Sequence, residues 1–194
     1  MRGDIQVIGA GLAGAEAAWP LAQRGHQVLL REMRPEHLTP AHHTGQAAEM
    51  VCSNSFKSDD PHSATGILKA ELRRMDSLLL RCADATRVPA GGSLAVDREA
   101  FARTVTGELR SHPRIHWEGG LVTQPDPGCP TVLATGPLTA EPLATWLFSA
   151  CGGERLAFYD AIAPIVLRDS IDLACAFRAS RYGKGEADFL NCPM

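Results

Sequence analysis

The chain has 194 residues, of which 45% are hydrophobic, and its formal net charge is −3. This length fits about one domain with a real core, and the near-neutral charge gives no global argument for binding nucleic acid or an acidic membrane. Its 6 cysteines lack CxxC spacing, which argues against both a zinc site and a disulfide framework and favours a reducing, cytoplasmic setting.

Hydropathy gives no sign of a membrane protein. No apolar run is long enough to span a bilayer, and the first residues lack the charged and apolar regions of a signal peptide. We therefore expect no membrane partner.

Residues 4–32 are the most informative stretch, and they predict a strand, a glycine turn, a helix and a second strand. Gly9, Gly11 and Gly14 form a G-x-G-x-x-G pattern where the first strand ends. Glu32 closes the second strand about 20 residues later, where an acid accepts hydrogen bonds from ribose hydroxyls. This order predicts a dinucleotide site, although the pattern does not separate FAD from NAD. The alternative is a strand–helix–strand unit whose glycines serve packing alone.

Each glycine has a predicted task. Gly9 permits the sharp turn, Gly11 lets the backbone approach a pyrophosphate, and Gly14 lets the helix pack against the strand. The helix N-terminus then offers free N–H groups to the phosphates. Pro20 removes one N–H from this helix, and Gly25 is its expected stop, before a strand over 26–31.

The stretch 34–45 is rich in Pro, His and Thr and predicts an irregular loop at the ligand end of the sheet. Met33 and Arg34 lie just past the ribose acid, where their side chains could cover an adenine. His42 and His43 are adjacent, so they point apart on most backbones. We expect solvated loop histidines there and predict no metal site.

Cys52 lies in a polar, turn-forming Ser-Asn-Ser context within residues 47–58. One interpretation is a small buried hydrophobe, which is common for thiols. The other is a nucleophile or general acid beside a cofactor, and the spacing does not decide between them.

Residues 64–83 predict one amphipathic helix. Leu68, Leu72, Met75 and Leu79 follow the spacing of a single buried face. The basic residues on its other faces indicate a solvated surface more than a phosphate-binding one.

Further along, residues 93–96 predict a strand. Asp97 is a good N-cap for a helix over 98–109, with Phe101, Val105 and Leu109 on one face.

Strands are also predicted over 115–122 and 131–134, and a helix over 138–150. The last strand runs into Thr135 and Gly136, which would bring backbone close to a ligand at the carboxyl edge of the sheet; an ordinary strand-to-helix turn fits equally well. After residue 153 the composition shifts towards short extended segments with turns (156–167, 171–177 and 191–194), which could open a second subdomain.

Assembled, these stretches resemble the bacterial folate- and FAD-dependent tRNA (uracil-5-)-methyltransferases, the TrmFO family. The most specific matching segments are EMRP, VCSNS and LNCPM, and the others include VIGAGLAGAEAAWPLAQRG, VPAGGSLAVDREAF, VLATGPLT and SRYGKGEADF. Together they cover nearly the whole chain.

The resemblance implies an α/β fold: a Rossmann-like FAD domain of the glutathione-reductase type over 1–153, incomplete, followed from 154 to 194 by the start of a second α+β domain. It implies transfer of a carbon from 5,10-methylenetetrahydrofolate to a uridine of the tRNA T-loop, with reduced FAD as reductant and NADH or NADPH to restore it.

The resemblance also assigns site residues. Cys52 falls on the family's N-terminal active-site cysteine, Glu32 would bind the ribose, and Thr135 and Gly136 would lie against the cofactor. The pyrophosphate would be held by the turn residues Gly9, Ala10, Gly11, Leu12, Ala13 and Gly14.

One departure from the family is plain: its second active-site cysteine has no counterpart here. We therefore expect an N-terminal portion of the family's chain that is inactive alone. The alternatives are another FAD-dependent oxidoreductase or tRNA-modifying flavoprotein, and an inactive FAD-binding fragment. Candidate tRNA contacts are Lys57, Arg73, Arg74, Arg181 and Lys184, and the sequence leaves the oligomeric state open.

Overall fold

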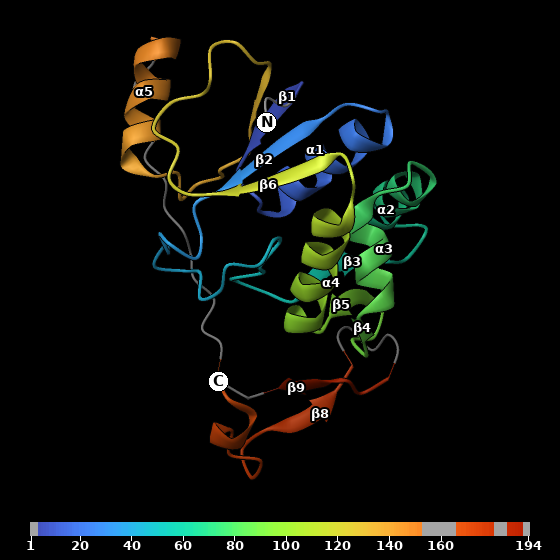
Figure 1. Cartoon of the computed structure of the whole chain (residues 1–194). Coiled ribbons are helices and arrows are strands. Elements are labelled where there is room, and N and C mark those ends of the chain that lie inside the picture. The colour runs from blue at the N-terminus through green and yellow to red at the C-terminus, as the bar shows by residue number, and fades with distance from the viewer. Residues whose placement is uncertain (1–3, 153–165, 181–185, 192–194) are drawn as a thin grey trace.

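A four-stranded parallel sheet forms the centre of the computed structural model, which describes residues 4–152, 166–180 and 186–191 (Figure 1). The strand order is β6-β2-β1-β7, and the strands are β1 (Ile5–Ile8), β2 (Val28–Glu32), β6 (Ile115–Gly119) and β7 (Thr131–Leu133). The predicted α/β class with a parallel sheet is confirmed.

Neighbouring residues of β1 face opposite sides of this sheet, as the two-residue period of a strand requires. Val7 belongs to the main core together with α1 (Leu12–Gln23). Ile8 belongs to a smaller cluster with Leu143 of α5 (Glu141–Cys151). Helices therefore cover both faces, and the ligand end of β1 lies between them.

Helix α4 (Arg98–Ser111) begins as the sequence predicted. The Asp97 side chain accepts a hydrogen bond from the Ala100 N–H at 2.9 Å, which satisfies a free donor of the first turn. Phe101, Val105 and Leu109 are fully buried, so the predicted face is confirmed. The helix continues past the predicted end to Ser111.

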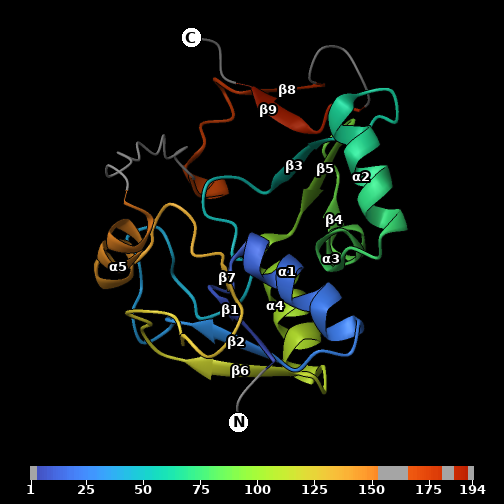
Figure 2. The same cartoon turned by 90° about the horizontal axis from the view of Figure 1, so that it is seen from above.

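A second, antiparallel sheet lies beyond the helices, in the order β3-β5-β4 (Figure 2). Its strands are β3 (Ser55–Ser58), β5 (Ser93–Val96) and β4 (Arg87–Val88). Strand β5 was predicted, whereas β3 was missed because its start is polar. The Val96 N–H donates to the Asn54 carbonyl at 2.9 Å, and the Asn54 side chain donates to the Val96 carbonyl at 3.1 Å. These long-range bonds make a strand of a segment whose local signals indicate a turn.

The single helix predicted over 64–83 is wrong. The structure has two helices, α2 (Ala64–Arg74) and α3 (Leu78–Ala85). Asp76 between them has a φ of +61°, outside the helical region. Ser77 then caps α3 by accepting from the Leu80 N–H at 3.2 Å.

This break overturns the predicted buried face. Leu68 is 53% exposed and Met75 is 71% exposed. Lys69 is buried instead, and its ammonium donates to the carbonyls of Phe56 and Thr65, both at 2.9 Å. Burial lowers the pKa of Lys69. Its bond to the Phe56 carbonyl fastens α2 to β3, whereas the Thr65 carbonyl belongs to α2 itself.

Several element boundaries differ from the prediction. The second strand covers Val28–Glu32 rather than 26–31, and the strand predicted over 115–122 ends at Gly119. The helix expected from Leu138 begins at Glu141, with Pro142 in its first turn. Residues 138–140 are thereby released to line a cavity.

The last described elements are a short 3-10 helix (Arg168–Ser170) and an antiparallel pair, β8 (Phe177–Ala179) and β9 (Phe189–Asn191). Over 171–177, where the sequence predicts an extended segment with turns, residues 173–175 form a turn and strand β8 begins only at Phe177. The domain boundary at 153/154, most of the segment 156–167 and residues 192–194 lie outside the described residues. No helix in the described part of the chain is long and apolar enough to cross a membrane.

Two leucines of the region predicted as one helix provide a direct test of its break. Leu78 is fully buried, whereas Leu68 is 53% exposed. We expect Leu78→Ala to lower the free energy of unfolding by about 2–5 kcal/mol, because it leaves a cavity. Leu68→Ala should change it by about 0.5 kcal/mol or less. Urea denaturation followed by circular dichroism measures both, and a larger loss for Leu68→Ala would contradict the two-helix arrangement.

Candidate functional site

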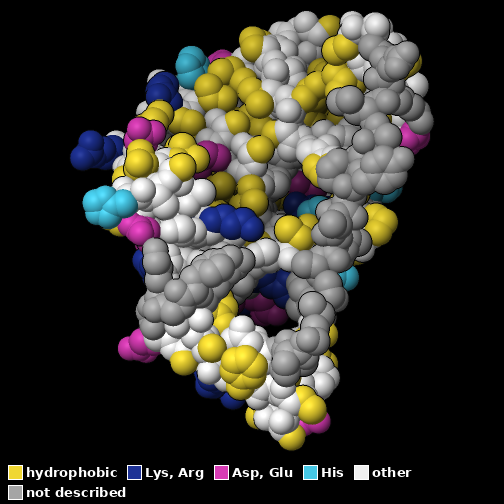
Figure 3. Space-filling view, turned by 180° about the vertical axis from the view of Figure 1, so that it is seen from behind, with side chains coloured by type: hydrophobic (Ala, Val, Ile, Leu, Met, Phe, Trp, Pro, Cys, Tyr) yellow, Lys and Arg dark blue, Asp and Glu magenta, His cyan; other side chains and the backbone are white. Residues whose placement is uncertain are grey.

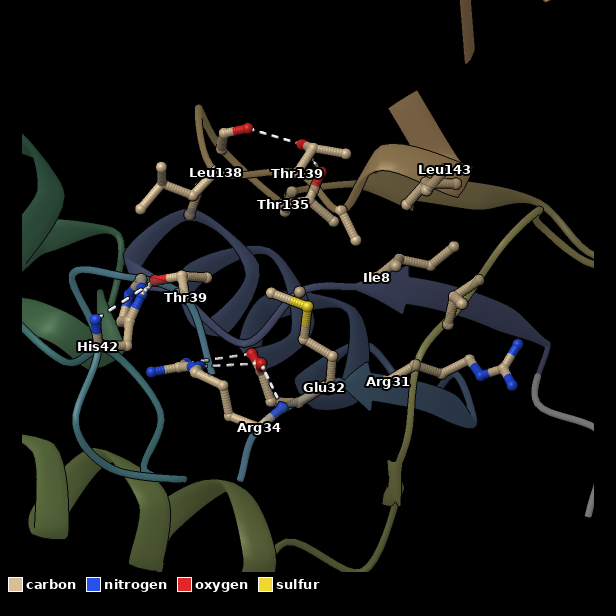
Figure 4. Close-up of a pocket in the computed structure, with 18 of the residues that line it drawn as sticks. Ile8, Arg31, Glu32, Arg34, Thr39, His42, Thr135, Leu138, Thr139 and Leu143 are labelled. Carbon is tan, nitrogen blue, oxygen red and sulfur yellow. Dashed lines mark hydrogen bonds and ion pairs between the residues drawn. The ribbon is translucent and has the colours of Figure 1, made fainter. Parts of the chain in front are cut away.

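A cavity of about 320 Å³ lies at the carboxyl ends of the parallel strands (Figure 4). This is the edge at which open α/β sheets bind their ligands. Its walls come from the segments after β1, β2, β6 and β7 and from the loop before β3. Among the lining residues are Gly9, Gly11, Leu12, Ala13, Glu32, Met33, Arg34, Thr39, His42, Glu49, Val51, Gly120, Val122, Thr135 and Gly136.

Two glycines of the turn are needed for packing. A Cβ on Gly9 would lie 2.7 Å from the Ala134 carbonyl oxygen, and the φ of Gly9 is +96°. A Cβ on Gly14 would collide with the carbonyl of Gly9, so α1 could not approach β1. The predicted packing role of Gly14 is therefore confirmed.

Gly11 is different, because packing does not explain it. Its backbone is extended (φ −66°, ψ −170°), which any residue can adopt. A Cβ there would meet no atom within 4 Å, and Gly11 lines the cavity. The interpretation that all three glycines serve packing alone thus fails at this position.

The N-terminus of α1 is open. No side chain caps it and no acidic residue lies in its first turn. Its first N–H groups and the positive end of the helix dipole are thus available to an anion at the cavity.

Glu32 lies in the cavity wall and is buried. One carboxylate oxygen accepts from the Ala10 N–H at 2.7 Å and from Arg34 Nη2 at 3.1 Å. The other accepts from the Arg34 N–H at 3.0 Å and from Arg34 Nε at 2.9 Å. Burial raises the pKa of Glu32, but the Arg34 guanidinium and these bonds outweigh it, so the pKa lies below its ordinary value. The protein itself thus fills about four acceptor positions, the capacity of a carboxylate.

Arg34 joins Glu32 to a second acid that the sequence did not single out. Arg34 Nη1 lies 3.1 Å from an oxygen of Glu49, and both residues line the cavity. Glu49 also accepts from the His43 N–H at 2.9 Å and from the Thr44 N–H at 3.1 Å. Burial raises the pKa of Glu49, but these hydrogen bonds lower it by more, so the pKa lies below its ordinary value and Glu49 is ionised at neutral pH.

The expectation of two solvated histidines is wrong for His42. Its ring lies in the cavity wall, with Nδ1 2.6 Å from the Thr39 hydroxyl oxygen (Figure 4). Burial and the Arg34 cation lower the pKa of His42, which keeps the ring neutral at pH 7. His43 is exposed, as predicted.

Backbone hydrogen bonds hold the loop before β3 against the glycine turn. The Ala48 N–H donates to the Ala10 carbonyl at 2.9 Å, and the Ala47 N–H donates to the Thr106 hydroxyl at 2.9 Å. Glu49 and Val51 are thereby placed in the cavity wall. No local signal in the sequence predicts this docking.

Cys52 follows Val51 directly and is exposed, so it is not a buried hydrophobe. Cys82 is the buried thiol, and burial raises its pKa to about 11, which makes it a poor nucleophile. Cys151 and Cys175 are exposed on other elements, and Cys192 lies outside the described residues.

The segment after β7 closes the cavity on its far side. The hydroxyl oxygens of Thr135 and Thr139 lie 2.6 Å apart, and the Thr139 hydroxyl donates to the Gly136 carbonyl at 2.7 Å. Thr135 and Gly136 therefore lie at the cavity with Gly9 and Glu32, as the sequence predicted for the strand edge.

Comparison with known proteins gives the chain a family. The model of Glucose inhibited division protein A (GIDA) matches residues 4–194. A protein of Desulfitobacterium hafniense named methylenetetrahydrofolate–tRNA-(uracil-5-)-methyltransferase TrmFO is 57% identical over 192 residues, 98% of this chain. The protein of that name from Bacillus subtilis is 54% identical over 190 residues, also 98% of this chain.

The chain spans 44% of the Desulfitobacterium hafniense protein and 43% of the Bacillus subtilis protein, less than half of either relative. A solved structure of GidA from Aquifex aeolicus aligns with 60% of this chain and 19% of that chain, at 16% identity and a TM-score of 0.48. The family assignment does not depend on that likeness. The chain belongs to the Glucose inhibited division protein A (GIDA) family.

Proposed function

We propose that this chain is the FAD-binding part of a tRNA methyltransferase that makes 5-methyluridine in the T-loop, with 5,10-methylenetetrahydrofolate as carbon donor. The observation that carries the proposal is the position of Cys52, an exposed thiol one residue from the wall of a dinucleotide-type cavity. The 57% identity to a relative named for this reaction supports it.

The cavity residues fit FAD. Gly11 leaves open space beside an uncapped helix N-terminus, which suits a pyrophosphate. In this proposal the pyrophosphate lies over the turn, and Glu32, Met33 and Arg34 take the ribose and adenine side. Because Ala10 and Arg34 already donate four hydrogen bonds to Glu32, a ribose hydroxyl would share a carboxylate oxygen with one of these donors. Thr135 and Gly136, in the segment after β7, lie against the cofactor on the other side of β1 from Glu32. The turn residues in contact are Gly9, Ala10, Gly11, Leu12, Ala13 and Gly14.

FAD would supply the reducing equivalents for the transferred carbon, and NADH or NADPH would restore it. The chain's own contribution is the Cys52 thiol. Carbon five of uracil becomes nucleophilic only after a thiolate adds at carbon six, and the carbon-five proton must later be removed. Cys52 would perform one of these two steps, and a reducing cytoplasm would keep its thiol free.

Among the cations considered for tRNA, Lys57 and Arg74 are exposed. Arg73 is engaged by Asp59 at 3.0 Å and by Asp84 at 2.8 Å, so we no longer propose it. Arg181 and Lys184 lie outside the described residues. On the face shown in Figure 3, Lys and Arg side chains stand apart, so any tRNA contact there would rest on single cations.

A substitution at Gly11 tests the FAD site. We expect Gly11→Val to fold normally and to bind FAD at least about tenfold more weakly, because its side chain fills space that only a ligand would use. The absorption of the purified protein near the flavin bands, with titration of added FAD, measures this. Gly107→Val is the matched control, since Gly107 also has open space around its Cβ position. Equal FAD affinity of the two variants would exclude the glycine turn as the pyrophosphate site.

Alkylation tests the position of Cys52. We expect saturating FAD to slow the reaction of iodoacetamide with Cys52 several-fold, because the bound cofactor lies beside this thiol. Cys175, exposed and on a different element, should react at the same rate with and without FAD. Peptide mass spectrometry reports both sites in one sample. Unchanged Cys52 labelling in a sample that binds FAD would place the thiol away from the cofactor.

The methyltransferase proposal is tested in a chimaera in which this chain replaces the matched region of the Bacillus subtilis relative. We expect the chimaera to methylate tRNA transcript, and Cys52→Ser to reduce the rate by at least about a hundredfold. Cys175→Ser should leave it unchanged. The chain alone should be inactive, so methylation by the chain alone would contradict that part of the proposal.

A further inference from the structure

Three charged side chains, Glu32, Arg34 and Glu49, lie together in the cavity wall at the end of β2, and their charges do not sum to zero. The Arg34 guanidinium lies 2.9 Å from a Glu32 oxygen and 3.1 Å from a Glu49 oxygen. The side chains of Arg34, Glu32 and Glu49 are 3%, 5% and 14% exposed, so solvent screens them little. One cation thus faces two carboxylates, which leaves this side of the cavity negative.

No other described residue of the cavity wall restores the balance. Arg31 is the other lining cation, and it pairs with Glu118 at 2.9 Å. Figure 4 shows its side chain extending away from Glu32 and Arg34. His42, on the opposite side of Arg34, is neutral at pH 7 because its pKa is lowered.

This charge pattern bears on which dinucleotide the cavity accepts. In dinucleotide sites the acid after the second strand accepts from the ribose hydroxyls, and a nearby free arginine accommodates a 2′-phosphate. Here an arginine is present at that place, but two carboxylates hold it. A 2′-phosphate would meet a net negative cluster instead of a free guanidinium.

We propose that Glu49 is a specificity-determining residue: it withholds Arg34 from a 2′-phosphate, so the cavity takes dinucleotides with a free 2′-hydroxyl and rejects 2′-phosphorylated ones. This inference rests on the proposed FAD site and deepens it. Because NADPH carries a 2′-phosphate, a flavin site with this property also keeps NADPH from binding in place of FAD. This holds whether NADH or NADPH is the reductant of the flavin.

Glu49 is a better point of test than Glu32. Glu32 accepts from the Ala10 N–H, so its loss would disturb the glycine turn as well as the charge. Glu49→Gln removes the charge and keeps an oxygen that can accept from the His43 N–H. Glu99→Gln removes the same charge from an exposed position on α4 and is the matched control.

The experiment measures the dissociation constants of ADP-ribose and 2′-phospho-ADP-ribose for the purified chain by displacement of FAD, at low salt. We expect the chain to prefer ADP-ribose by at least about tenfold, and Glu49→Gln to narrow that ratio about tenfold. Glu99→Gln and Glu49→Asp should keep the original ratio. The ratio of the unmodified chain should also narrow as salt screens the repulsion, which tests the inference even if Glu49→Gln does not fold.

Each outcome decides. If ADP-ribose binds but Glu49→Gln keeps the original ratio, or if the unmodified chain prefers the 2′-phosphorylated ligand, the inference is overturned while the dinucleotide proposal stands. A ratio independent of salt overturns it in the same way. If neither ligand displaces FAD, or FAD itself does not bind, the cavity is not a dinucleotide site and the inference fails with the proposed function.

Discussion

The hydrogen bond from the Ala10 N–H to the Glu32 carboxylate joins the two halves of the ligand edge. At 2.7 Å it connects the turn after β1 with the end of β2, and both residues are buried. A bond from a backbone donor to a buried, ionised acceptor is among the strong hydrogen bonds of a protein. Because the same carboxylate also holds Arg34, the turn, the strand end and the loop that follows form one connected polar unit.

A second contact extends this unit to the thiol. The Ala10 residue that donates to Glu32 also accepts, through its carbonyl, from the Ala48 N–H. Four residues after Ala48 the chain reaches Cys52. The cavity wall and the exposed thiol are thus positioned from the same residue of the glycine turn, Ala10, and their relative placement does not depend on a long flexible connection.

Much of the sheet and one helix face could be predicted from the sequence, since their signals are local. The Asp97 cap and the Phe101–Val105–Leu109 spacing each lie at or within one helix, and the glycine pattern with Glu32 lies within one strand–turn–helix–strand unit of consecutive residues. The break at Asp76 is not predictable from the apolar spacing of residues 68–79, because that spacing runs straight across it, and only the Ser77 cap marks the start of a new helix. Strand β3 was missed because Asn54 finds its partner Val96 far along the chain.

The candidate site divides in the same way. Glu32 and the glycines are identifiable because their spacing along one strand–turn–helix–strand unit fixes their geometry. Glu49, Thr39 and His42 were not, since a Pro- and His-rich loop carries no period from which a direction can be deduced. What brings them to the cavity is a set of contacts with Arg34, Thr106 and the glycine turn.

The position of β7 in the strand order has a consequence of its own: within the described part of the chain, β7 pairs with β1 on one side and with no strand on the other. Where no strand of the described residues covers it, the outer row of backbone donors and acceptors of β7 is a template for an extended peptide, so strand addition between copies is the route of self-association that this edge offers.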